Sequence, residues 1–207
     1  MRLSAPLRFT SLALALVASA GCTAPSGAQV GQPVVPRVAT ASAAATLVDV
    51  NGQPGGRATL TQTAAGVEIV LNVEAQKPGD HGVHVHANGK CEPGPDPSGN
   101  TIAFGAAGGH FDPGMSKKHG GPGKAPEAGH AGDVPNIGVA ADGTGTLRYT
   151  HPHATLGTGP ASVLGKALVM HAGPDDYRTD PAGNSGARVL CGVIESARPV
   201  VPKTNQG

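Results

Sequence analysis

The segment GVEIVLNV, residues 66–73, largely alternates apolar and polar side chains along its length. Because successive side chains of a β-strand point to opposite faces, this alternation is typical of a strand with one buried face. The buried face is predicted to hold Val67, Ile69, Leu71 and Val73. Shorter strand-like segments lie on both sides of it, at residues 47–50, 58–61, 83–86, 137–140, 145–150, 167–171 and 189–194.

Turn residues separate these segments, and Asp142-Gly143, between the segments 137–140 and 145–150, is a hairpin signal. After the first 21 residues, no segment shows the helical period of an amphipathic helix. Many short strands joined by turns predict an all-β domain, folded as an antiparallel sandwich or barrel.

Two long stretches interrupt the strand pattern, at residues 87–136 and 172–187. Loops of this length inside a compact domain are usually functional, and we expect bound metal and a disulfide to order them. The chain has nine histidines although only 14% of its residues are charged, which points to metal chemistry. With a formal net charge of +1, nothing in the sequence indicates a nucleic-acid partner.

The first 21 residues have the layout of a secretory signal peptide. Arg2 and Arg8 are positively charged, residues 12–17 are apolar, and Ala18-Ser19-Ala20 is a small-residue cleavage site. The apolar run is far shorter than the roughly 20 residues that a membrane-spanning helix needs. We therefore expect an exported protein, in the periplasm or the cell envelope.

Two cleavage sites stay open at the end of this signal. Ala20-Gly21-Cys22 resembles the end of a bacterial lipoprotein signal, in which the cysteine is lipidated and anchors the chain to a membrane. Ser19, however, stands where a large aliphatic residue is usual in such signals. Cleavage after Ala20 would instead leave Cys22 as a free thiol in an oxidising compartment.

The pair His84 and His86, in the strand segment 83–86, is the first candidate metal site. Residues two apart in a strand point to the same face, with Cα atoms roughly 6.5 Å apart, so two imidazoles can grip one ion. Neutral imidazole binds copper and zinc well. His171 ends the strand segment 167–171 in a similar way. Surface histidine pairs are common, so this pair alone is a weak signal.

The stretch 87–136 carries three more histidines and an aspartate among glycines. They are His110, His119, His130 and Asp133. Three nitrogen donors and one carboxylate fit a tetrahedral zinc site, and glycines let the backbone fold tightly around an ion. The alternative is a flexible polar loop with scattered histidines.

Taken together, these motifs resemble copper/zinc superoxide dismutase of the bacterial exported type. The matching segments run in order along the chain: GVHVH at 82–86, GHF at 109–111, HGGP at 119–122, HAGD at 130–133 and GNSGARVLCGVI at 183–194. The resemblance implies an antiparallel Greek-key β-sandwich or flattened barrel with two long metal-binding loops. The predicted organisation is a signal peptide at 1–21, a flexible linker or lipid tether at 22–40, the dismutase domain at 41–196 and a disordered tail at 197–207.

The resemblance implies copper and zinc as cofactors, held by two sets of ligands that share one histidine. The copper ligands would be His84, His86, His110 and His171. The zinc ligands would be His110, His119, His130 and Asp133. The implied activity is dismutation of superoxide to oxygen and hydrogen peroxide, in which His110 bridges the ions and carries a proton.

Three further expectations follow from the resemblance. Arg188 would lie beside the copper and attract the superoxide anion, which makes it a second catalytic candidate. Asp175 would accept hydrogen bonds from one copper histidine and one zinc histidine. Cys91 and Cys191 would form a disulfide, which export permits, and the alternative is two buried free thiols. A homodimer stays open, since the sequence carries no clear interface signal.

Residues 176–183 lack the lysine and glutamates that animal members of this family use to steer the anion. Arg178, Lys117 and Lys118 are the candidate substitutes. Three histidines match no ligand of the family. We expect His81 to be a structural hydrogen-bonding residue, and His151 and His153 to be a solvated loop pair.

Two other functions compete with the enzyme. The first is a non-catalytic copper or zinc carrier, and the second is a purely structural sandwich domain. A carrier has no use for an arginine beside an open copper position, and a structural relative is expected to have lost ligands. Arg188, together with the complete set of ligands, therefore favours the enzyme.

Overall fold

Residues 40–197 are the part of the chain that the structure, a computed structural model, describes. The predicted signal peptide, Cys22, the linker up to residue 39 and the tail after residue 197 lie outside the described residues. Within 40–197, no helix has the length and apolar character needed to cross a membrane.

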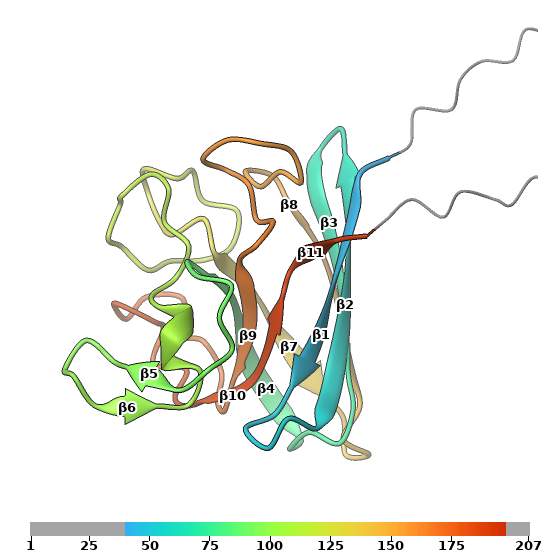
Figure 1. Ribbon diagram of the computed structural model, residues 1–207, viewed down its shortest axis with the longest axis vertical. Helices are drawn as coiled ribbons and strands as arrows, with labels where there is room; N and C mark the ends of the chain where they lie inside the picture. The colour runs from blue at the N-terminus through green and yellow to red at the C-terminus, as the bar shows by residue number, and fades with distance from the viewer. Residues whose placement is uncertain (1–39, 198–207) are drawn as a thin grey trace, which may run out of the picture. The chain divides into compact units, whose positions relative to one another are not determined.

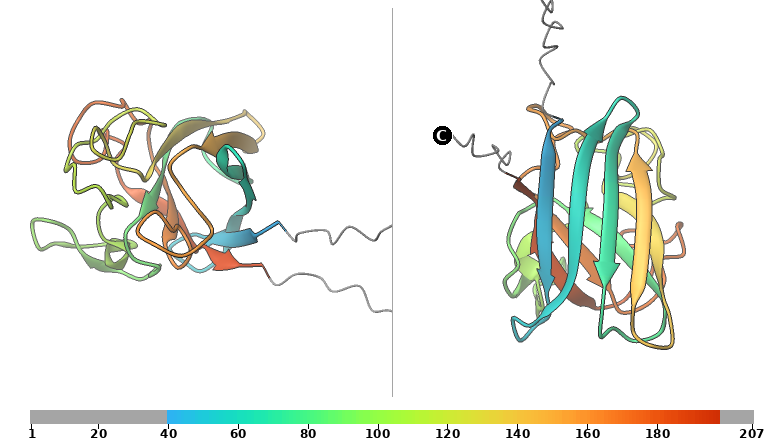
Figure 2. Two further views of the ribbon diagram at one scale, coloured as in Figure 1. Left: turned by 90° about the horizontal axis from the view of Figure 1, so that it is seen from above. Right: turned by 90° about the vertical axis from the view of Figure 1, so that its right-hand side faces the viewer.

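Nine strands of the described residues pair into one antiparallel sheet that closes on itself (Figure 1; Figure 2). They are β1 (Ser42–Val48), β2 (Pro54–Thr63), β3 (Gly66–Val73), β4 (Gly79–His86), β7 (Asp133–Val139), β8 (Gly145–His151), β9 (Ala167–His171), β10 (Arg188–Val193) and β11 (Glu195–Ser196). The spatial order is β10-β9-β4-β7-β8-β3-β2-β1-β11, and a pairing of Val48 in β1 with Cys191 in β10 closes the barrel.

The connections are those of a Greek key. β4 follows β3 in the chain but is not its neighbour, because β7 and β8 return to fill the place between them. The predicted all-β, antiparallel Greek-key fold is therefore confirmed.

The inside of the barrel carries the apolar residues that the alternation predicted. In β3, Val67, Ile69, Leu71 and Val73 are at most 3% exposed, whereas Asn72 is exposed. Other parts of the chain fill the same core with Leu47, Leu60, Ile137, Leu190 and Ile194. Each such buried side chain contributes about 1.5–3 kcal/mol to folding. This core fixes β4 and β9, the strands that carry the first candidate ligands.

The start of β1 differs from the prediction. β1 begins at Ser42 rather than at residue 47, and its first inward positions are Ala43 and Ala45. Alanine is too small and too common outside strands to mark a buried strand face in a sequence pattern.

The stretch 87–136 contains more regular structure than its sequence indicated. It includes β5 (Gly94–Pro95), β6 (Thr101–Ile102) and the 3-10 helix η1 (Gly105–Ala107). β7 also begins inside it, at Asp133, because Asp133 and Val134 pair with His84 and Val83 of β4. The prediction that this stretch lacks strands is therefore wrong, because its polar residues hide the alternation. The stretch 172–187 contains no strand or helix.

Candidate metal centre

Four histidines converge on one point from two adjacent strands and a loop. β4 carries His84 and His86, and its neighbour β9 ends at His171. His110, in the loop after η1, pairs with His86 in an isolated antiparallel bridge. All four are at most 8% exposed, and their candidate ligand nitrogens lie within 4.8 Å of one another. The structure thus brings together the four residues that the sequence grouped around copper.

Hydrogen-bond acceptors in the protein determine which nitrogen of each ring carries the proton. His84 Nε2 donates to Asp175 Oδ2 over 2.9 Å. The Nδ1 atoms of His86 and His171 donate to backbone carbonyls, over 2.9 Å and 3.1 Å. Because a neutral imidazole carries one N–H proton, the other nitrogen of each ring carries a free lone pair. Four such nitrogens are buried without a hydrogen-bond partner: His84 Nδ1, His86 Nε2, His110 Nε2 and His171 Nε2.

These converging lone pairs fit a copper ion. Imidazole nitrogen is a preferred donor for copper, and hydrogen bonds to the far nitrogen are the usual way to orient a metal-binding histidine. Burial lowers the pKa of His84 and His171 to about 4 and of His110 to about 3, and holds the pKa of His86 well below its usual value. The rings are therefore neutral near pH 7, as metal binding requires.

A second cluster surrounds a single carboxylate oxygen, Asp133 Oδ1. The Nδ1 atoms of three rings face this oxygen, at 2.8 Å for His110, 3.2 Å for His119 and 3.7 Å for His130. In a tetrahedral zinc site with bonds of about 2.0 Å, donor atoms lie about 3.3 Å apart, so these spacings are near those of a zinc shell. The Nδ1 atoms of His119 and His130 are buried without a hydrogen-bond partner.

The charges of this cluster also fit a cation. Burial alone would lower the pKa of His119, but its proximity to the carboxylates of Asp133 and Asp175 outweighs burial and raises the pKa to about 9. Burial would raise the pKa of Asp133, yet the hydrogen bond from His110 and the nearby rings of His119 and His130 hold it well below its usual range. Two buried carboxylates favour a positive charge at this point. A proton on His119 supplies it at neutral pH, and zinc would supply it in place of that proton when bound.

His110 faces both clusters, through Nε2 toward the first and through Nδ1 toward Asp133. His130 is the member of the second cluster whose Nδ1 lies farthest from Asp133 Oδ1. The ligand atoms here that all lie within 4.8 Å of one another include one from His84 and none from His130. His84 comes close because its ring stacks on His110, with centroids 3.9 Å apart. Asp175 already occupies its Nε2, so the one free nitrogen of His84 serves the first cluster.

Asp175 connects the two clusters. Its Oδ2 accepts from His84, and its Oδ1 accepts from His119 Nε2 over 2.8 Å. Asn136 of β7 holds the backbone of Asp175 on both sides, accepting from its N–H over 2.9 Å and donating to its carbonyl over 3.0 Å. Gly183 leaves room for the carboxylate, because a Cβ there would lie 1.7 Å from Asp175 Oδ1. Neither Asn136 nor Gly183 was predicted from the sequence.

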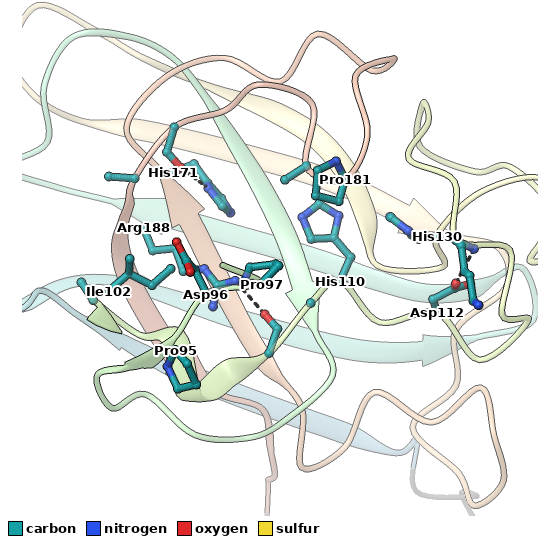
Figure 3. A pocket seen from close by; sticks show the side chains of 17 residues that line it. Pro95, Asp96, Pro97, Ile102, His110, Asp112, His130, His171, Pro181 and Arg188 are labelled. Carbon is teal, nitrogen blue, oxygen red and sulfur yellow. Dashed lines mark hydrogen bonds between the residues drawn. The ribbon is translucent and has the colours of Figure 1, made fainter. Parts of the chain in front are cut away.

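An open cavity of about 720 Å³ leads to the first cluster. Figure 3 shows Arg188 and His171 on one side of it, His130 on the other and His110 between them. Arg188 donates to the backbone carbonyls of Phe104 and Gly108, each over 2.7 Å. A guanidinium fixed in this way beside an imidazole cluster provides a docking point for a small anion.

The predicted disulfide between Cys91 and Cys191 is confirmed, and it joins residues 100 positions apart. Cys191 lies in β10, the strand that begins at Arg188, and packs with Phe104 in a small apolar cluster. The bond therefore ties the loop that holds the Arg188 guanidinium to the strand that carries this residue.

Of the three candidate steering residues, only Lys117 lines the cavity, and Lys118 and Arg178 are not part of its lining. Asp96 and Asp112 also line it. The positive charge near the cavity mouth is therefore partly offset by carboxylates.

The three histidines outside the clusters have different surroundings. The ring nitrogens of His81 lie 2.7 Å and 2.8 Å from the carbonyls of His171 and Lys77, which confirms its structural role. The expectation of a solvated pair is wrong for His151, which is the last residue of β8 and is 1% exposed. β8 runs one residue further than predicted, and this residue turns inward opposite Val67 of β3.

Comparison with known proteins identifies the family. Residues 54–194 match the family model described as copper/zinc superoxide dismutase. A Cu-Zn superoxide dismutase of Deinococcus radiodurans is 43% identical over 188 residues, which are 91% of this chain and 98% of that protein.

Solved structures agree with this assignment. The Cu/Zn superoxide dismutase from Brucella abortus matches with a TM-score of 0.65 and 34% identity, over 74% of this chain and 99% of that one. A SOD-like protein from Bacillus subtilis matches with a TM-score of 0.61 and 33% identity, over 72% of this chain and 96% of that one. The chain therefore belongs to the copper/zinc superoxide dismutase family, whose members are oxidoreductases with copper and zinc as cofactors.

Proposed function

We propose that this enzyme dismutates superoxide at a pair of metal ions joined by one histidine ring. The copper ligands are His84, His86, His110 and His171, and the zinc ligands are His110, His119, His130 and Asp133. The observation that carries the proposal is the convergence of buried, unpartnered imidazole nitrogens on two points that share the ring of His110. When bound, copper supplies the one-electron couple that takes an electron from one superoxide and gives it to another, while zinc keeps the second nitrogen of the shared ring occupied.

Arg188 binds and orients the anion. Two of its N–H groups are used by the carbonyls of Phe104 and Gly108, and a guanidinium has five, so others are left for superoxide. Because the group is partly buried, its attraction for an anion is stronger than in bulk water. The two carbonyls hold it in place, so that little side-chain entropy is lost when the anion docks.

His110 supplies one of the two protons that the reaction needs. Two superoxide anions and two protons give one oxygen and one hydrogen peroxide, so each departing peroxide takes up both protons. The Nε2 atom of His110 faces the first cluster, and the residue lines the cavity. In the half of the cycle in which its bond to copper would be open, this atom would hold a proton taken from solvent, pass it to the peroxide and bind copper again. Water in the open cavity supplies the second proton.

Metal analysis of the purified protein, combined with a superoxide-consumption assay with and without cyanide, tests the proposal. We expect one copper and one zinc per chain, and activity that cyanide abolishes because it binds copper. His119→Ala should lower the zinc content, whereas His153→Ala, which keeps every proposed ligand, should not. Full occupancy by both metals without consumption of superoxide would refute the proposed activity, and unchanged zinc content in His119→Ala would refute the zinc assignment.

We also propose that the enzyme acts outside the cytoplasm and protects the cell envelope from superoxide. The signal-like segment 1–21 supports export, and the disulfide is of the kind that persists in oxidising compartments. Mass spectrometry of the mature N-terminus separates a lipidated Cys22 from a chain cut after Ala20. A mature chain that keeps the whole segment would contradict export, and the mass of the protein in solution separates a monomer from a homodimer.

A further inference from the structure

His151 is the last residue of β8, and its side chain is buried. Its Nδ1 accepts a hydrogen bond from the backbone N–H of His153 over 3.2 Å, and its Nε2 is hydrogen-bonded to the carbonyl of Ala131. A backbone N–H can only donate, so Nδ1 carries no proton and Nε2 is the atom that donates to Ala131. Burial lowers the pKa of His151, which favours this neutral ring.

Ala131 lies between two proposed zinc ligands, His130 and Asp133. Its neighbour Gly132 accepts a hydrogen bond from the N–H of Val85 over 2.9 Å, and Val85 belongs to β4. A Cβ at Gly132 would lie 2.2 Å from the Val85 carbonyl oxygen, so this approach of the two backbones is close. The segment 130–133 is therefore held by β4 through Gly132 and by His151 through Ala131.

We propose that His151 is a positioning residue for zinc, because its hydrogen bond to the Ala131 carbonyl sets where His130 and Asp133 present their ligand atoms. This rests on the zinc ligands proposed above. His130 depends on it most, since its Nδ1 is the farthest of the three ring nitrogens from Asp133 Oδ1, at 3.7 Å. His151 touches neither the ion nor the substrate in this role.

Zinc affinity of the copper-free protein, measured by competition with a chelator, tests the proposal. His151→Leu fills the space of the ring with an apolar side chain and removes the donor. His151→Gln places an amide donor near the position of Nε2. We expect His151→Leu to weaken zinc binding by about 10–100-fold and His151→Gln to recover affinity to within about threefold of wild type. His153→Leu is the matched control, because it removes the neighbouring ring and keeps the backbone N–H, and its zinc affinity should equal that of wild type.

Copper affinity of the same variants separates positioning from general damage, and we expect it to change by less than about threefold. Zinc affinity of His151→Leu within about twofold of wild type overturns the proposal. An equal loss of zinc and copper affinity that His151→Gln does not recover also overturns it. If thermal unfolding shows that His151→Leu does not fold, His151→Asn, whose amide is too short to reach Ala131, takes its place with the same expected loss.

The zinc site itself is checked in parallel. A wild-type chain that binds no zinc, or a His119→Ala variant that binds it as tightly as wild type, shows that the zinc ligands are misassigned, and the role of His151 then falls with them. One tightly bound zinc in wild type, lost in His119→Ala and kept in His151→Leu, refutes the role of His151 alone.

Discussion

Replacing Gly183 by alanine should both destabilise the fold and weaken zinc binding. Gly183 has a φ of +62°, and a Cβ there would lie 1.7 Å from Asp175 Oδ1 and 2.6 Å from His119 Nε2. The left-handed backbone costs an L-residue about 1–2 kcal/mol, and forcing a methyl group into a packed site costs about 1–3 kcal/mol. The free energy of unfolding should therefore fall by about 2–5 kcal/mol.

Gly52→Ala is the matched control, because Gly52 has a φ of +77° but nothing lies within 4 Å of the place that its new methyl group would take. It should lose only the backbone cost of about 1–2 kcal/mol. Urea unfolding of the metal-free variants measures both values. Gly183→Ala should also lose about 10–100-fold in zinc affinity, because the Asp175 carboxylate must move away from His119. Equal stability and equal zinc affinity in the two variants would refute the claim that the carboxylate needs this space.

Three further predictions concern the cavity and the disulfide. Arg188→Gln should slow turnover by about tenfold or more with copper content unchanged, and wild-type rates would remove Arg188 from the mechanism. Replacing Cys91 and Cys191 by serine should lower the free energy of unfolding in urea by up to about 4.7 kcal/mol, since the bond closes a loop of 100 residues, and a change below about 1 kcal/mol would contradict this. Lys117→Gln should weaken the ionic-strength dependence of the rate more than Arg178→Gln, because Lys117 lines the cavity and Arg178 does not. Equal effects in the two variants would contradict this role.

The strands that can be predicted from the sequence are those whose packing alternates along the chain. The pattern predicts β3 nearly to the residue, because its inward side chains are large and aliphatic and its outward ones are mostly not. The same pattern predicts that β7 begins at residue 137, whereas the strand begins at Asp133. The first residue is missed because it is polar and yet buried. Hydrophobic patterning finds residues that are buried for packing, and it misses those that are buried for chemistry.

Some of the candidate ligands follow from the strand pattern, and others follow only from the resemblance to a family. The strand period puts His84 and His86 on one face, which follows from the sequence itself. Grouping loop residues such as His119 and His130 into one site depends on the resemblance to a family, because no local pattern relates their positions.

The residues that support the site could not be predicted. Asn136 and His151 bind partners 39 and 20 residues away in the chain, and Gly183 makes room beside His119 of a different loop, so each contact depends on how separate segments pack. His151 is the clearest case. Its neighbours Pro152 and His153 are typical of a surface loop, and only the register of β8 against β3 shows that the ring points inward.

One ring, that of His110, is proposed to serve both ions, and electron paramagnetic resonance tests this most directly. The protein would be loaded with Cu²⁺ at the first cluster and Co²⁺ at the second, with occupancy checked by metal analysis. If the ring of His110 bridges the ions, it couples their spins, and the Cu²⁺ signal seen with Zn²⁺ at the second cluster should be lost. A Cu²⁺ signal of full intensity with both sites filled would contradict the shared ring.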